Sequence, residues 1–252
     1  MKKYIKKLPF ISNLVKYLDN LNDRRKFVAT ALASLSDDSR LLDAGCGSQR
    51  FRKYAAHLDY RGQDFGEYLG DEKTSFATEE TAQTGAEHHY QYGRLDYVGD
   101  IWNINEDSSY FDAVLCTEVF EHIPYPELAL AEFSRLLKPG GSLILTVPSN
   151  CLRHMDPYFY YTGFSDRWLT HFLNKHGFID IDIQPIGDYY KWLAVEMMRT
   201  MVSQGLFAKI ALLPAFLYYL SKRPTENSID TLCMGYHVLA RRDEDSVERD
   251  IE

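Results

Sequence analysis

The sequence predicts an α/β protein built on a doubly wound, mostly parallel, seven-stranded sheet of Rossmann-like type. From residue 40 onward, short apolar runs alternate with longer stretches of helical periodicity, and parallel strands need such crossover connections. The first apolar run leads directly into two closely spaced glycines, which a tight turn at a strand end favours. The chain has 252 residues, of which 45% are hydrophobic, enough for one large domain with its own core.

Each expected element follows from apolar spacing and from the turn residues beside it. The last strand is expected to be antiparallel and to follow a helical insert at 188–230. Helices are expected at 125–137 and 166–176, and Lys138-Pro139-Gly140-Gly141 supplies a helix stop after the first of them. The strands are expected at 41–44, 58–64, 97–100, 111–116, 142–147, 179–186 and 231–240.

The expected domain organisation is a helical extension at 1–30, a core domain at 31–242 and an acidic tail at 243–252. Residues 1–26 carry eight Lys or Arg against two Asp, although the whole chain has a net charge of −8. The acidic body argues against a partner made of nucleic acid. Apolar residues in the extension recur every three or four positions, which indicates an amphipathic helix that packs on the domain or lies on a membrane surface.

The N-terminal pattern and the cysteine spacing restrict where in the cell the protein is expected to be found. No apolar run of signal-peptide length follows the basic start. The four cysteines lie far apart without a Cys-x-x-Cys pair, so neither a zinc ribbon nor a disulfide scaffold is indicated, and no metal is expected. The sequence therefore favours a cytoplasmic protein, at most peripheral to the inner face of a membrane.

Three acidic residues stand at the ends of neighbouring predicted strands. Asp43 precedes the glycine bend Gly45-Cys46-Gly47, Asp64 ends the second strand and Asp100 ends the third. In doubly wound sheets the ligand lies beyond the carboxyl ends of the strands. Asp43 is suited to a ligand ammonium, Asp64 to two ribose hydroxyls and Asp100 to an adenine amino group. The helix expected after the bend would offer its N-terminal N–H groups.

Position 50 distinguishes this bend from a dinucleotide fingerprint. A Gly-x-Gly-x-x-Gly motif would have its third glycine there, but Arg50 occupies the position. This counts against a bound pyrophosphate. An oxidoreductase that binds NAD or a nucleotide sugar remains the alternative from another class, and a cofactor-binding protein without catalysis is a third.

Taken in order, the segments LLDAGCGSQRF, YRGQDFGEY, YVGDIW, FDAVLCTEVFEHI and LLKPGGSLILTVPSN resemble the class I S-adenosylmethionine-dependent methyltransferases, in the branch acting on small molecules and sugars. The resemblance covers roughly residues 40–150 and implies S-adenosylmethionine as cofactor. One departure is Gln49, where many members have a glycine. By this resemblance, the cofactor-binding residues are Asp43, Gly45, Cys46, Gly47, Asp64, Phe65, Asp100, Ile101, Thr117 and Glu118.

Two histidines lie on loops at the same predicted sheet edge. His122 follows the fourth strand and His154 follows the fifth; either is suited to remove a proton from an attacking hydroxyl. Asp156 is close enough in sequence to orient His154. The aromatic segment after it predicts a lid that excludes water, with Tyr158, Tyr161 and Arg153 as substrate contacts.

The expected reaction is O-methylation of a sugar or glycan hydroxyl. A quinone or small aromatic hydroxyl, or an amino group, is the alternative acceptor. The insert contains the apolar run 206–220, interrupted by Lys209 and Pro214 and too short to span a bilayer. It predicts a membrane-surface contact, a homodimer face or a substrate lid.

Overall fold

The computed structural model describes residues 18, 20–69 and 91–244. The chain divides into two compact units, one of residues 1–26 with 185–234 and one of residues 27–184 with 235–252. Most of the predicted N-terminal amphipathic helix, the middle of the polar stretch after the second strand, and the acidic tail lie outside the described residues.

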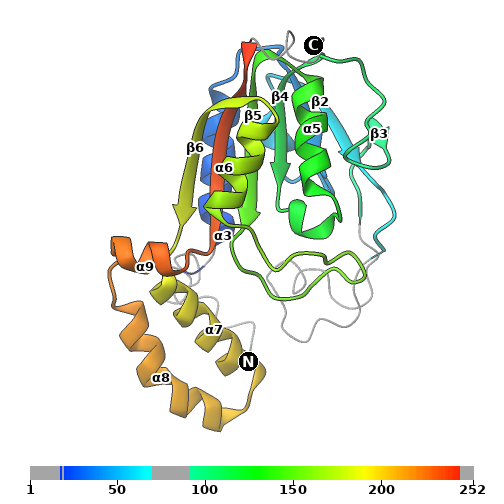
Figure 1. Ribbon diagram of the computed structural model, residues 1–252. Helices are drawn as coiled ribbons and strands as arrows, with labels where there is room; N and C mark the ends of the chain where they lie inside the picture. The colour runs from blue at the N-terminus through cyan, green and yellow to red at the C-terminus, as the bar shows by residue number, and fades with distance from the viewer. Residues whose placement is uncertain (1–17, 19, 70–90, 245–252) are drawn as a thin grey trace. The chain divides into compact units, whose positions relative to one another are not determined.

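The larger unit is built on a seven-stranded sheet (Figure 1) with the strand order β3-β2-β1-β4-β5-β7-β6. Neighbouring strands from β3 to β5 pair in parallel, whereas β7 runs antiparallel to β5. The predicted fold class is confirmed. The strands are β1 (Arg40–Ala44), β2 (Asp59–Asp64), β3 (Tyr97–Val98), β4 (Phe111–Thr117), β5 (Leu137–Pro148), β6 (Phe178–Ile186) and β7 (Gly235–Arg242).

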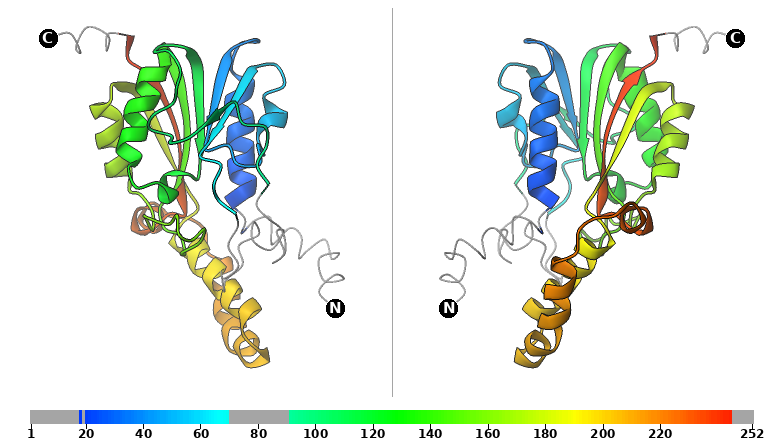
Figure 2. Two further views of the ribbon diagram at one scale, coloured as in Figure 1. Left: turned by 90° about the vertical axis from the view of Figure 1, so that its right-hand side faces the viewer. Right: turned by 90° about the vertical axis from the view of Figure 1, so that its left-hand side faces the viewer.

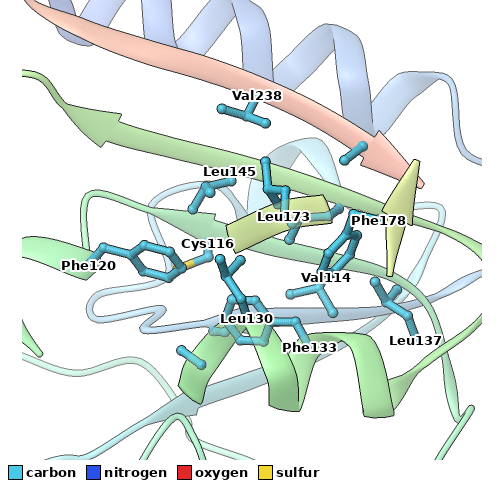
Figure 3. Packing of buried hydrophobic residues seen from close by; sticks show 14 of the residues in the cluster. Val114, Cys116, Phe120, Leu130, Phe133, Leu137, Leu145, Leu173, Phe178 and Val238 are labelled. Carbon is cyan, nitrogen blue, oxygen red and sulfur yellow. The ribbon is translucent and has the colours of Figure 1, made fainter. Parts of the chain in front are cut away.

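Helices cover both faces of this sheet, and Figure 2 shows α3 (Asn20–Ala33) on one side with α5 (Pro126–Leu136) and α6 (Asp166–Lys175) on the other. Both helices on the α5 side contribute fully buried residues, among them Phe133 and Leu173. Figure 3 shows Phe133 beside Leu130 and Val114. On the other face, Val28 and Leu32 of α3 pack with Leu41 of β1. Because β1, β4 and β5 are covered on both faces, the middle of each strand is a run of mainly apolar residues.

The helix predicted directly after the glycine bend is absent. Only a single 3₁₀ turn, η1 (Arg52–Tyr54), forms there. The backbone is left-handed at both Gly47 and Gln49, and β2 begins at Asp59. An α-helix requires successive right-handed residues, so little chain remains for one before β2. No helix N-terminus is therefore available at the bend to bind an anion.

The last predicted strand also begins later than expected. Residues 226–231 form α9 (Glu226–Thr231), and β7 starts only at Gly235. The Thr225 hydroxyl accepts the Ser228 N–H at 3.1 Å, and the Ser228 hydroxyl accepts the Thr225 N–H at 2.9 Å. This capping box satisfies the first backbone donors of the helix. The helix therefore takes Thr231, the first residue of the predicted strand, and residues 232–234 connect it to β7.

The smaller unit contains the predicted helical insert. It consists of α7 (Tyr189–Ser203), α8 (Leu206–Leu220) and α9, together with described residues from the start of the chain. Its core is formed by Leu18, Ala194, Val195 and Phe216. Asp188 caps α7 by accepting the Lys191 N–H at 2.9 Å. Among the described residues, no helix combines the length and the apolar character needed to cross a bilayer.

Candidate functional site

The bend after β1 is held by steric contact and by backbone hydrogen bonds. Gly45 has a φ of +71°, and a Cβ at this position would lie 2.4 Å from Cγ2 of Val119. The N–H groups of Gly45 and Cys46 both donate to the Gln63 carbonyl at 2.9 Å. Only glycine satisfies both the conformation and the close approach at position 45. The backbone of the bend is therefore fixed by Gln63 at the end of β2 and by Val119 after β4.

Asp43 lies inside this edge of the sheet with only 2% of its surface exposed. The Tyr60 hydroxyl donates to its Oδ2 at 2.5 Å. Burial raises the pKa of the Asp43 carboxyl to about 7, although the Tyr60 hydrogen bond opposes this rise, and the charge of Asp64 adds to it. A buried carboxylate of this kind is stabilised when a cation approaches. A ligand carrying an ammonium group fits the site on that ground.

Asp64 binds the bend from the neighbouring strand. Its Oδ2 accepts the Gly47 N–H at 2.9 Å, and its Oδ1 accepts the Gly66 N–H at 3.3 Å. Burial raises the pKa of this carboxyl, and the backbone N–H donors oppose that effect. Each carboxylate oxygen can accept a second hydrogen bond. Asp64 can thus shape the bend and still accept ligand hydroxyls, the role that the resemblance assigns to it.

The third acidic residue is more open to solvent. Asp100 is exposed, whereas Ile101 beside it is buried in the main core. The Gly99 N–H donates to the Asp64 carbonyl at 3.1 Å, which ties this segment to the end of β2. Since β3, β2 and β1 are neighbours in the sheet, Asp100, Asp64 and Asp43 come from adjacent strand ends. The predicted placement of these three residues at neighbouring strand ends therefore agrees with the strand order.

Gln49 fills the space beside the bend. Hypothetical Cβ atoms on Gly62 and Gly93 would lie 2.6 and 2.4 Å from its amide group. Its Nε2 donates to the Arg94 carbonyl, and its Oε1 accepts from Arg52 at 2.9 Å. The residue that departs from the family pattern therefore joins the bend to the segment that enters β3.

Two of the predicted cofactor-binding residues, Thr117 and Glu118, lie at the end of β4. Glu118 follows Thr117 with a φ of +51°. Its N–H donates to the Thr146 carbonyl at 2.9 Å, and its Oε1 accepts the Thr146 hydroxyl, also at 2.9 Å. These contacts orient Glu118 from β5. Phe65, the remaining predicted cofactor residue, has its ring 4.8 Å from that of Tyr158.

The two candidate histidines lie against each other, with ring centroids 4.6 Å apart and an interplanar angle of 86°. His122 Nδ1 is 2.7 Å from the Tyr158 carbonyl oxygen, and His154 Nδ1 is 2.8 Å from the Leu152 carbonyl oxygen. A carbonyl oxygen only accepts hydrogen bonds, so each Nδ1 carries the proton in the neutral ring. In both residues Nε2 is then the basic nitrogen.

The expectation that Asp156 orients His154 is wrong. The Asp156 carboxylate pairs with the Arg153 guanidinium at 2.8 Å, while the Leu152 carbonyl orients the histidine. The Arg153 side chain is 73% exposed. Asp156 is thus committed to a surface ion pair that forms over three residues. An ion pair between residues three apart can form locally without help from the rest of the fold. Here it competes with the predicted contact between Asp156 and His154.

A buried carboxylate stands beside the histidine pair. Glu121 is 1% exposed, and the ligand-type atoms of Glu121, His122 and His154 all lie within 4.8 Å of one another. No metal is expected from the sequence, in which no ligand cluster is evident. One carboxylate and two imidazole nitrogens can receive a proton or coordinate a divalent cation such as Zn²⁺.

The loops after β4 and β5 are bound together by backbone contacts. The N–H groups of Tyr160 and Tyr161 donate to the Glu121 carbonyl at 2.9 and 3.2 Å. The Tyr161 hydroxyl donates to the Pro124 carbonyl at 3.0 Å. Tyr161 therefore has a structural contact at the position predicted to meet substrate. It also lines a cavity of about 370 Å³ together with Ser149, Gly163, Phe164, Ser165 and Trp168.

Three residues of the site escaped the sequence analysis. The Tyr60 hydroxyl donates a hydrogen bond to Asp43, and the Val119 side chain packs against Gly45. Glu121 lies beside the two histidines. Tyr60 could have been found from strand register, because Asp43 pairs with Gly62 and residues two apart on a strand share a face. Glu121 could not be recognised from the sequence, because its closeness to His154 depends on how the loop after β4 packs against the loop after β5.

Residues 42–145 match the family model described as a methyltransferase domain. The chain is 33% identical over 108 residues to a ubiquinone biosynthesis O-methyltransferase of Xanthomonas axonopodis pv. citri (strain 306), covering 43% of this chain and 42% of that protein. A protein of the same name from Xanthomonas oryzae pv. oryzae (strain PXO99A) is 33% identical over 131 residues, 52% of each chain. The chain spans about half the length of the curated relatives it matches.

Solved structures support the fold. One is phosphoethanolamine N-methyltransferase 2 of Haemonchus contortus in complex with S-adenosyl-L-methionine (TM-score 0.51, 19% identity, 88% of this chain and 52% of that chain). Another is the [4+2]-cyclase SpnF (TM-score 0.52, 20% identity, 88% of this chain and 80% of that chain). The fold alone therefore does not specify the reaction, which has to be argued from the site.

Proposed function

We propose that the chain is an S-adenosylmethionine-dependent O-methyltransferase acting on a small aromatic hydroxyl, because residues 42–145 match the family model of a methyltransferase domain and lie on a seven-stranded, mostly parallel sheet. The observations that carry the proposal are the glycine bend bordered by buried Asp43 and Asp64 and two adjacent histidines whose Nδ1 atoms face backbone carbonyls, which makes Nε2 the basic nitrogen. The bend is suited to hold a cationic nucleoside and the histidines to accept a proton.

The residues at the bend fit S-adenosylmethionine by chemistry. Asp43, whose carboxyl has a raised pKa because it is buried, regains a favourable environment beside the ammonium of the methionine moiety. Asp64 accepts ribose hydroxyls, and Asp100 with Ile101 borders the adenine. Gly45 and Gly47 remove side chains where the ligand approaches. Cys46, Phe65, Thr117 and Glu118 complete the proposed contacts.

The bound cofactor supplies an electrophilic methyl group on a sulfonium, and the chain supplies orientation, exclusion of water and a proton acceptor. His154 is the proposed base and His122 the residue beside it. A phenol ionises with a pKa of about 10, within the range that an imidazole can assist at neutral pH. A sugar hydroxyl is a much weaker acid, so the same residues assist it less. Tyr158 and Arg153 remain proposed acceptor contacts.

The relatives named ubiquinone biosynthesis O-methyltransferase favour a quinone precursor over a sugar. The alternatives are a sugar hydroxyl and an amino group. We propose the aromatic hydroxyl because it agrees with both the histidine chemistry and these relatives.

Two measurements test the proposal. In calorimetry with S-adenosylmethionine and NAD side by side, we expect binding of S-adenosylmethionine only, and binding of NAD alone would overturn the assignment. In the second, catechols, glycans and amines are incubated with methyl-labelled cofactor and analysed by mass spectrometry. We expect label on a phenolic oxygen, and exclusive labelling of a glycan or an amine would contradict the proposed acceptor.

A further inference from the structure

One face of α8, in the unit of residues 1–26 and 185–234, is apolar and exposed. Leu206, Phe207 and Ile210 are exposed by 72%, 85% and 66%. Leu213 and Leu217 continue the same face at intervals of three and four residues and are also exposed. Exposed large apolar side chains are normal when scattered singly, but a continuous row indicates a contact surface.

The opposite face of α8 is already used within its own unit. Phe216 is 5% exposed and packs with Ala194 and Val195 of α7. The ring of Tyr219 stacks on that of Tyr190, with centroids 6.3 Å apart. The packing of α7 against α8 therefore does not use the exposed row on the other side of α8. This row is called the outer face of α8 below and consists of Leu206, Phe207, Ile210, Leu213 and Leu217.

Within α8 and the residues that flank it directly in the sequence, the charges have one sign. Residues 200–225 contain Lys209, Lys222 and Arg223 but no Asp or Glu, in a chain whose net charge is −8. Lys222 lies 4.3 Å from the ring centroid of Tyr218 at the end of α8. Apolar residues bordered by cations are typical of helices that lie in the interface of an anionic bilayer.

A second copy of the chain fits this surface less well. In a symmetric dimer the same patch meets itself, so the cations of both copies would border one interface to which residues 200–225 contribute no acidic side chain. The helix also cannot cross a bilayer, because it has 15 residues and contains Pro214. We propose that the outer face of α8 binds the surface of a membrane that contains anionic lipids. This inference does not depend on the reaction.

The test is flotation of the full chain with vesicles of equal parts phosphatidylglycerol and phosphatidylcholine, or of phosphatidylcholine alone. We expect clear binding to the anionic vesicles and weaker binding to the neutral ones. Phe207→Asp should lower the affinity for anionic vesicles about tenfold or more, because a large apolar side chain is no longer buried in lipid. Lys209→Glu should lower it at least about fivefold and should have less effect on neutral vesicles.

Leu128→Asp is the matched control. Leu128 is 49% exposed on α5, so the same charge is introduced on an apolar surface residue of the other unit. We expect its vesicle binding to equal that of the unchanged chain, and circular dichroism checks that each variant is folded. Since Phe207 is 85% exposed, its replacement should not unfold the helix.

Three results would overturn the proposal. The first is no flotation of the unchanged chain with either vesicle. The second is unchanged binding of Phe207→Asp to anionic vesicles, or a loss of binding by Leu128→Asp as large as that expected for Phe207→Asp. The third is a dimer in analytical ultracentrifugation that Phe207→Asp dissociates while vesicle binding is unchanged, because the outer face would then bind a second copy. None of these results bears on methyl transfer, which is assayed with a soluble acceptor.

Discussion

The two sides of the candidate site are built by different means. On the β1–β2 side, glycines with left-handed backbone and buried carboxylates shape the bend within a few residues of two strand ends. On the side of the β4 and β5 loops, histidines more than thirty residues apart in sequence are oriented by backbone carbonyls. The β1–β2 side depends on glycine and aspartate at fixed positions, where few other residue types would fit. The other side depends on how the loops after β4 and β5 pack against each other.

The largest expected effect falls on the loop side. His154→Ala should lower turnover about 10²- to 10⁴-fold, the usual contribution of general acid–base catalysis, while the affinity for S-adenosylmethionine stays within about twofold. Steady-state kinetics on a phenolic acceptor and calorimetry measure the two quantities. A variant with full turnover would remove His154 as the base.

A chelator separates two roles for the same histidine pair. If Glu121, His122 and His154 act on protons, EDTA should leave the turnover of the unchanged enzyme intact. Loss of turnover with EDTA and recovery with Mg²⁺ or Zn²⁺ would contradict the role of His154 as base and assign the three side chains to a cation instead.

On the strand side, Asp43→Asn should weaken S-adenosylmethionine binding by about 1.5–3 kcal/mol, since a charged partner of the ammonium is lost. The same change should stabilise the protein without ligand. The pKa of this carboxyl is raised from 3.8 to about 7, so the folded chain binds more protons than the unfolded chain between these values, and stability falls as pH rises through them.

The stability effect of Asp43→Asn therefore depends on pH. Above pH 7 the gain in unfolding free energy is at most about 4 kcal/mol, and below about pH 4 it should vanish. Thermal unfolding at pH 4 and pH 8 measures it. Tyr60→Phe is the matched comparison, because it removes the hydrogen bond to the carboxylate and should destabilise the chain at pH 8. A gain from Asp43→Asn that is equal at both pH values would contradict burial as the cause.

A smaller effect is expected at the second strand end. Asp64→Ala should lower S-adenosylmethionine affinity by about 1–3 kcal/mol, because it removes a buried acceptor and releases the Gly47 and Gly66 N–H groups. Calorimetry measures the affinity, and turnover at saturating cofactor should change little. Unchanged affinity would remove Asp64 from the ribose role and leave it only the task of shaping the bend.

The smallest effect concerns the ion pair between the β5-loop residues Arg153 and Asp156. Asp156→Asn should change the unfolding free energy by less than about 1 kcal/mol, since exposed ion pairs contribute little, and turnover should stay close to that of the unchanged enzyme. A large loss of turnover would contradict a purely surface role for the pair between Arg153 and Asp156. Thermal unfolding and steady-state kinetics provide both measurements.

Local sequence predicted most of the larger unit and the strand side of the site. The apolar runs of β1, β4 and β5 are read directly because strands covered on both faces need continuous apolar residues. Gly45 was identifiable because a tight bend restricts the residue type. The same reasoning failed at the helix expected after the bend, since left-handed backbone at Gln49 is not required by its residue type and depends on contacts with Gly62 and Gly93.

What the sequence alone determined is therefore the sheet, its order of elements and the acidic residues at three strand ends. Only the tertiary structure decided that Tyr60 contacts Asp43, that Leu152 rather than Asp156 orients His154, and that Glu121 joins two histidines. The reason is physical: strand periodicity and glycine conformation are local properties of the chain. Contacts between loops depend instead on packing among residues that are distant in sequence, and no local pattern encodes those partners.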